Sequence, residues 1–187
     1  MIGSQNGINP IFDELPLIAR SHLERAAQLS GETVRLSASK GGQVEVIASV
    51  IGSSENSLLA SVGSANSPLL GASSKSLLSG VPDVDVIEFI EKQRSLGTVP
   101  ETFHQESFLE DLAKIRAHGW ARDAGESNPE IRAYGAPIFD AGGTVAASVS
   151  IVFIRSKEKI KGDQCRQLVV ETANRISEEL DRRQLCC

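Results

Sequence analysis

Two pairs of strand-forming segments, each joined by a glycine turn, most constrain the fold of this chain. Glu32–Ser39 and Val44–Gly52 alternate apolar and polar residues around the sequence KGGQ. Glu130–Asp140 and Thr144–Ile154 form a second pair around AGG. A short glycine-rich connection joins antiparallel neighbours, whereas parallel strands need a long crossover. The sequence therefore predicts an antiparallel sheet.

Helical periodicity appears before, between and after these pairs. We predict helices over residues 13–29, 71–80, 83–95, 102–119 and 161–184, a short strand at 120–123 and a further strand within 57–63. The strands do not alternate one by one with helices, so a parallel α/β sheet is disfavoured. The order predicts an α+β domain in which helices flank an antiparallel sheet.

Length and composition limit the class of protein. With 187 residues, the chain suffices for one sizeable domain, which we place at residues 12–184, after a disordered lead-in or cloning remnant (1–11) and before a tail (185–187). The net charge of −5 argues against direct binding of nucleic acid, since phosphates are bound by Lys and Arg. No apolar run approaches the length of a membrane span, so no membrane partner is expected.

Cysteine and histidine positions give little support to catalysis or metal binding. Three cysteines, two of them adjacent at the C-terminus, fit a reducing cytoplasm and no disulfide framework. His22, His104 and His118 have no metal-ligand spacing, and GASSK lacks the second glycine of the G-x-S-x-G motif. We therefore expect no enzyme activity, no catalytic residue, no metal and no cofactor.

Several motifs, in order, resemble the effector-binding, C-terminal domain of IclR-type bacterial transcriptional regulators. They are SGETVRLSASKGGQVEVIASV, SPLLGASSKSLL and FLEDLAKIRAHGWARDAGESNPEIRAYGAPIFDAGGTVAASVSI. The resemblance covers residues 12–180. It implies a GAF-like fold, with a curved antiparallel sheet, helices on one side and a ligand pocket on the other. It also implies a homodimer or homotetramer, and DNA binding only through a winged helix-turn-helix domain that this sequence lacks.

The resemblance also implies a binding site for a small organic acid between the sheet and the predicted helix at 71–80. The predicted ligand-binding residues are Ala72, Ser73, Ser74, Asp123, Ala133, Ser148, Ser150 and Val152. Free N–H groups at a helix start attract a carboxylate, and the serines can add hydroxyls. Each residue also has an ordinary structural explanation: serine N-capping, turn formation by Asp123, and hydroxyls bonded to nearby carbonyls.

Departures from the family pattern bear on the ligand. Ala133 stands where the family often has Cys, Val152 where it often has Ser, and Ser74 where it has Gly. They favour a larger organic acid, such as an aromatic one, over a two- or three-carbon acid. Two alternatives to a sensor stay open: a GAF-like enzyme, such as a redox enzyme using Cys165, and an oligomerisation domain without a ligand.

Overall fold

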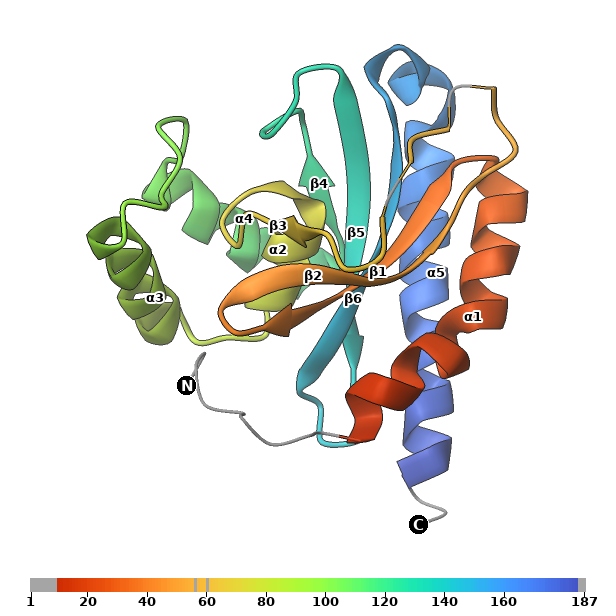
Figure 1. Ribbon diagram of the computed structural model, residues 1–187, viewed down its shortest axis with the longest axis horizontal. Helices are drawn as coiled ribbons and strands as arrows, with labels where there is room; N and C mark the ends of the chain where they lie inside the picture. The colour runs from red at the N-terminus through yellow and green to blue at the C-terminus, as the bar shows by residue number, and fades with distance from the viewer. Residues whose placement is uncertain (1–9, 56, 60, 185–187) are drawn as a thin grey trace.

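The computed structural model describes residues 10–55, 57–59 and 61–184 of the chain (Figure 1). The predicted tail, and all of the predicted lead-in except residues 10 and 11, lie outside these residues. The elements follow in the order α1 (Pro10–Ser30), β1 (Thr33–Lys40), β2 (Gln43–Val50), β3 (Ala65–Asn66), α2 (Gly71–Leu78), α3 (Asp83–Ser95), α4 (Gln105–His118), β4 (Ala121–Asp123), β5 (Ile131–Phe139), β6 (Val145–Ile154), a 3₁₀ turn (Arg155–Lys157) and α5 (Glu158–Gln184).

The six strands form one sheet in the order β3-β2-β1-β6-β5-β4. Every neighbouring pair is antiparallel. The two predicted hairpins, β1–β2 and β5–β6, are joined by pairing of β1 with β6, so the first and last long strands meet at the centre. The sheet curls strongly in Figure 1. The α+β fold with a curved antiparallel sheet is thereby confirmed.

The prediction for the third strand was wrong in position. The described residues within 57–63 form no strand, and β3 is only the pair Ala65–Asn66. Val46 instead bonds to the loop, donating from its N–H to the carbonyl of Ser64 and accepting from the N–H of Gly63. The serine-rich loop thus crosses the edge of β2 without pairing along its length.

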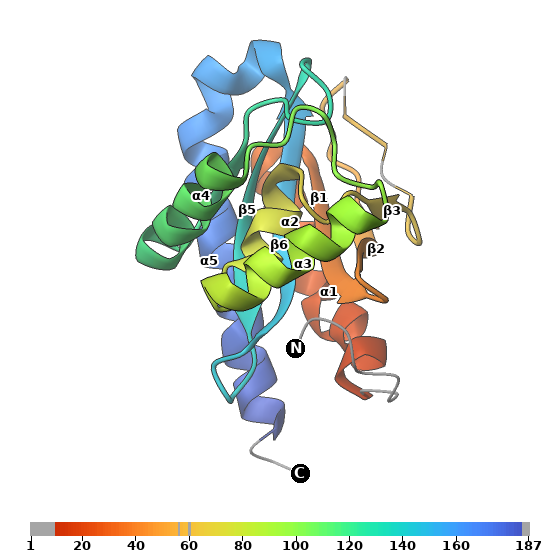
Figure 2. The same cartoon turned by 90° about the vertical axis from the view of Figure 1, so that its left-hand side faces the viewer.

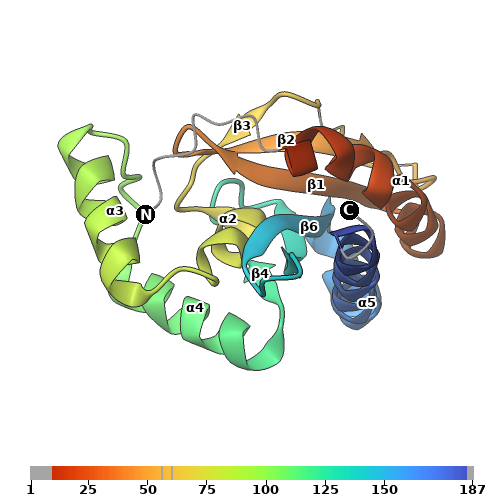
Figure 3. The same cartoon turned by 90° about the horizontal axis from the view of Figure 1, so that it is seen from below.

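Helices α1 and α5 cover one face of the sheet (Figure 3). Their apolar stripes pack on the even-numbered residues of β1 and β5 and the odd-numbered residues of β6, which include Val34, Leu36, Tyr134, Ala136, Ile138, Ala147, Val149, Ile151 and Phe153. Consecutive strand residues point to opposite faces, so each strand gives this core every second side chain. Burial of these large apolar groups is the main source of the stability of this half.

A buried carboxylate fixes the junction between α1, β1 and α5. The side chain of Glu32 is fully buried and accepts hydrogen bonds from Lys157 (2.8 Å), Lys161 (2.9 Å) and Ser54 (3.0 Å). Burial raises the pKa of Glu32, but these bonds outweigh burial and hold the pKa below its ordinary value. The network thus satisfies a charge that would be costly to bury alone.

Helices α2, α3 and α4 lie on the opposite face of the sheet (Figure 2). Residues of α2 pack with Ala133 of β5 and Val152 of β6 in a second core, which α3 and α4 complete from outside. Helices therefore cover both faces, whereas the resemblance implied helices on one face only. In the part of the chain that the structure describes, no helix combines the length and apolarity needed to cross a bilayer.

Candidate functional site beneath helix α2

The two faces of the sheet differ sharply in chemistry. The face under α1 and α5 carries large apolar side chains, whereas the face under α2 carries small or polar ones at the alternate positions. These are Thr33, Arg35 and Ser37 of β1, Ser148, Ser150 and Val152 of β6, Ala133, Gly135 and Pro137 of β5, and Ala121 and Asp123 of β4. A sheet face that only had to stabilise the fold would be expected to carry larger apolar groups.

Strand register brings five of the predicted site residues together. Ser150 lies opposite Arg35 on one side and Gly135 on the other. Val152 lies opposite Ala133, which in turn lies opposite Asp123. Directly opposed residues point to the same face. Asp123, Ala133, Ser148, Ser150 and Val152 therefore form one continuous surface across three strands, all of it buried.

Helix α2 contributes the other three predicted residues, but in different ways. The hydroxyl of Ser73 donates to that of Ser150 at 3.1 Å, which links the helix to the centre of the sheet. The backbone of Ala72 lies against β5, where a Cβ added to Gly135 would be 2.9 Å from the Ala72 carbonyl oxygen. Ser74 points back to the preceding loop and donates to the carbonyl of Ser67 at 2.7 Å.

A carboxylate of the chain itself lies at the start of α2. Glu126 accepts a hydrogen bond from the N–H of Gly71 at 2.8 Å and pairs with the buried ammonium of Lys75. Lys75 also donates to Asp111 of α4 at 3.1 Å. The N-cap residue of α2 is Leu70, which offers no side-chain cap, so Glu126 takes that function. The alternative of serine N-capping at residues 72–74 does not describe this helix.

Asp123 forms the turn after β4 and also faces α2. One carboxylate oxygen accepts hydrogen bonds from the N–H groups of Gly125 (2.8 Å) and Glu126 (2.9 Å), an Asx turn. The other oxygen points toward the start of α2, 3.4 Å from the position that a Cβ on Gly71 would occupy. Asp123 therefore forms the turn, as its structural explanation proposed, and its side chain also lies on the face that carries Ala133 and Ser150.

Several polar atoms on this buried face lack a protein partner among the described residues. They are the hydroxyls of Ser37, Ser49, Ser76 and Ser148 and the Nε of Arg35. Ser76 belongs to α2, and its hydroxyl would be 3.0 Å from a Cβ on Gly135. Buried polar groups are nearly always paired, because an unpaired one forfeits its hydration. Four of these five atoms belong to β1, β6 and α2, the elements that meet at this face.

Arg35 is the main feature of the site that the sequence analysis missed. Burial lowers the pKa of its guanidinium, and the negative charge of Asp123 only partly offsets that effect. Arg35 forms no hydrogen-bonded ion pair within the described residues. The signal was present in the first strand, where Val34, Leu36 and Ala38 share one face and leave Thr33, Arg35 and Ser37 for the other.

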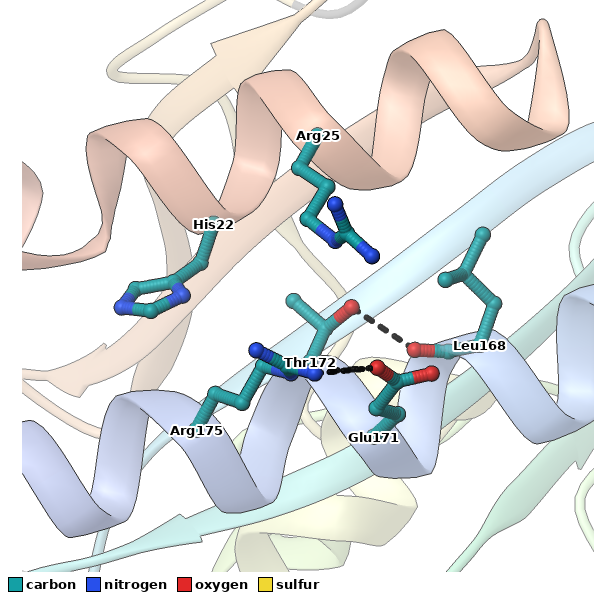
Figure 4. Close-up of a pocket in the computed structure, with 6 residues that line it drawn as sticks. All are labelled: His22, Arg25, Leu168, Glu171, Thr172 and Arg175. Carbon is teal, nitrogen blue, oxygen red and sulfur yellow. Dashed lines mark hydrogen bonds and ion pairs between the residues drawn. The ribbon is translucent and has the colours of Figure 1, made fainter.

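A separate surface depression lies between α1 and α5, away from the predicted residues. It is shallow and is lined by His22 and Arg25 of α1 and Leu168, Glu171, Thr172 and Arg175 of α5 (Figure 4). Arg175 pairs with Glu171, and Thr172 donates to the carbonyl of Leu168. Its residues are mostly engaged with one another, and it is a groove between two helices.

Cys165 and the possible metal ligands are the side chains that redox chemistry or metal binding would use. Cys165 lies in the core under α5, where burial raises the pKa of its thiol to about 11. A thiolate is therefore disfavoured at this position. Over the described ranges, no group of three His, Cys, Asp or Glu side chains is placed to hold a metal ion.

Known proteins resemble this chain in both sequence and fold. Residues 13–178 match the family described as the bacterial transcriptional regulator IclR C-terminal domain. The chain is 29% identical over 143 residues to the uncharacterized HTH-type transcriptional regulator RhmR of Escherichia coli (76% of this chain, 55% of the relative). It is 31% identical over 136 residues to the HTH-type transcriptional regulator BhcR of Paracoccus denitrificans (71% and 48%).

Solved structures give the same result for the fold. Thermotoga maritima IclR aligns with a TM-score of 0.78 and 29% identity, covering 89% of this chain and 68% of that one. The transcriptional regulator YaiJ aligns with a TM-score of 0.81 and 24% identity, covering 89% and 95%. The chain spans about half the length of the curated relatives it matches. The chain belongs to the family of IclR-type transcriptional regulators and contains their C-terminal, effector-binding domain.

Proposed function

We propose that this domain senses a small organic carboxylate bound between α2 and the sheet and thereby alters DNA binding by an attached helix-turn-helix domain. The observation that carries the proposal is the set of buried, unpartnered polar atoms beneath α2. A ligand that supplies hydrogen bonds to Ser37, Ser76 and Ser148 would recover free energy that the unliganded fold forgoes. The predicted residues Ala72, Ser73, Ala133, Ser150 and Val152 would then line the site.

Entry of such a ligand requires α2 to move. Ala72 lies against Gly135, and the site residues of the sheet are buried beneath the helix. A ligand that binds only when α2 is displaced would shift the protein toward that arrangement. Glu126 links α2 to the β4–β5 turn, and Lys75 links it to α4, so a displacement of α2 would be passed to the surface through these ion pairs.

The output of the sensor follows from the family. The relatives named above are HTH-type regulators, and this chain has a net charge of −5, so its contact with DNA would come from an attached basic domain. A homodimer or homotetramer stays our prediction for the assembly. A cytoplasmic location goes with this proposal, because a regulator of transcription acts where the DNA is.

Ligand class within this proposal is a small organic acid. The apolar side chains of Ala133 and Val152 would contact a larger or aromatic part of the ligand. The unpartnered serine hydroxyls would donate hydrogen bonds to oxygen atoms of the same ligand. Enzyme activity is not part of the proposal, since Cys165, the residue that a redox mechanism would use, is buried with a raised pKa.

Thermal and chemical unfolding with a panel of carboxylates tests the proposal. A ligand present at 100 times its Kd stabilises the folded state by about 2.7 kcal/mol. We expect at least one acid in the panel to do this, and its neutral amide to fail. Ser148→Ala should reduce that stabilisation without destabilising the free protein, because the hydroxyl has no protein partner to lose. If no acid in the panel stabilised the protein, an oligomerisation domain without a ligand would be favoured instead.

A further inference from the structure

Arg35 occupies the centre of the polar face beneath α2. It lies on β1 directly opposite Ser150 of β6 and Ser49 of β2, at the point where Ser73 of α2 contacts Ser150. Its guanidinium carries five N–H donors, of which none has a protein acceptor within the described ranges, and its Nε is fully removed from solvent. The positive charge of Arg35 thus lies beside the hydroxyls of Ser49 and Ser150 without a hydrogen-bonded carboxylate among the described residues.

Among the described residues, no carboxylate neutralises this charge by direct contact. Asp123 is the acidic group that acts on Arg35, and it does so through space. One oxygen of Asp123 is committed to the turn at Gly125 and Glu126. Glu126 and Asp111 are both bound to Lys75. Glu126, Asp111 and one oxygen of Asp123 are therefore engaged elsewhere, while Arg35 keeps its donors.

An arrangement of this kind is unfavourable for folding and favourable for recognition. A partly buried cation without a hydrogen-bonded partner loses hydration that nothing in the protein replaces. The planar fork of a guanidinium matches a carboxylate with two parallel hydrogen bonds, and binding in a water-poor space strengthens both. Ser37 and Ser148 lie opposite each other on β1 and β6, on the same face as Arg35, and their hydroxyls, like that of Ser76 on α2, are also unpaired.

We propose that Arg35 is the residue that selects the ligand, by binding its carboxylate through a bidentate contact while the serines of β1, β6 and α2 bind hydroxyl or carbonyl oxygens along the same molecule. This inference rests on the proposed function and names the recognition element within it. The carboxylate is placed on β1 at the middle of the sheet, whereas the start of α2 is held by Glu126. The ligand class is therefore an oxygen-substituted carboxylic acid.

The test compares Arg35→Met and Arg35→Lys with Arg20→Met as a matched control. Arg20 is an exposed residue of α1 that pairs with Glu24 on the same helix. The probes are glycolate, 2-oxobutyrate, D-gluconate and 4-hydroxybenzoate, each measured by urea unfolding and by calorimetric titration. Glucose, at the same concentration, is the control for gluconate, because it has similar hydroxyls but no charge. Inorganic phosphate tests whether the site binds any anion.

We expect the free Arg35→Met protein to be at least as stable as the wild type, and its affinity for the best carboxylate to fall about 10- to 100-fold. Arg35→Lys should bind more weakly than the wild type, since an ammonium lacks the fork, and Arg20→Met should bind normally. Glucose should not bind. Phosphate should bind less tightly than the best carboxylate, because it lacks the further hydroxyl or carbonyl oxygens that the serines would bind.

Four results would overturn the inference. Unchanged carboxylate affinity in Arg35→Met would remove Arg35 from recognition and leave the sensor proposal standing. Unfolding of Arg35→Met, together with wild-type affinity in Arg35→Lys, would make Arg35 a structural residue. Tighter binding of phosphate than of any carboxylate would assign the residue to another ligand class. Failure of every carboxylate to bind the wild type would end both proposals, whereas unchanged affinity in Arg35→Met would end only the assignment of Arg35.

Discussion

Substitution of Gly135 by Ala tests whether α2 really lies against the sheet in the free protein. The new Cβ would be 2.9 Å from the carbonyl oxygen of Ala72 and 3.0 Å from the hydroxyl of Ser76. Unstrained contacts between nonbonded heavy atoms lie at roughly 3.5 Å. The first contact is with helix backbone, so α2 has to withdraw by about half an ångström, since no side-chain rotation relieves that contact.

The cost follows from two opposing effects. Overpacking of a well-packed interior costs roughly 1–3 kcal/mol. Replacing a strand glycine by alanine recovers about 0.5–1 kcal/mol of backbone entropy. The midpoints of these two ranges differ by about 1 kcal/mol, so we expect a net loss of that size in the free energy of unfolding, which for a chain of this length lowers Tm by about 2–4 °C.

Urea unfolding followed by circular dichroism measures this loss, with Gly162→Ala as the control. Gly162 lies in α5, and an added Cβ would be in ordinary contact, 3.4 Å from the hydroxyl of Tyr134. Alanine there should gain up to about 1 kcal/mol through helix propensity. If Gly135→Ala proved as stable as the wild type while Gly162→Ala behaved as expected, the close approach of α2 to β5 would be refuted.

Two further substitutions probe the buried charges. Glu126→Gln should lower the free energy of unfolding in urea by roughly 1–3 kcal/mol. Asp111→Asn should lower it by less, because Asp111 is the more exposed partner of the buried Lys75. Equal losses in the two variants would contradict this ranking. For Glu32, the lowered folded-state pKa means that its stabilising contribution is present above the unfolded-state value near pH 4.5 and is lost as pH falls through the folded-state pKa. Glu32→Gln should therefore flatten the fall of stability in acid below about pH 4.5, and an unchanged slope would rule out this group as its source.

The sequence alone determined the helices, the long strands and the strand pairing within each hairpin. Glycine turns between alternating segments predicted both hairpins, and helical spacing placed the five helices within a few residues of their ends. These signals are local, because a turn or a helical stripe is encoded by residues close together in the chain. Alternation also indicated that Ser148 and Ser150 share a face.

Only the tertiary structure decided what covers that face. The sequence could not show that Glu126 lies at the start of α2, 55 residues away in the chain. It also could not show that Arg35 has no hydrogen-bond acceptor among the described residues. The pairing of β1 with β6, which brings Arg35 opposite Ser150, joins residues more than a hundred positions apart. The physical reason is that periodicity determines which side chains share a surface, whereas the partners of those side chains depend on how distant elements pack. The energetic cost of a buried charge can be judged only when its neighbours are known.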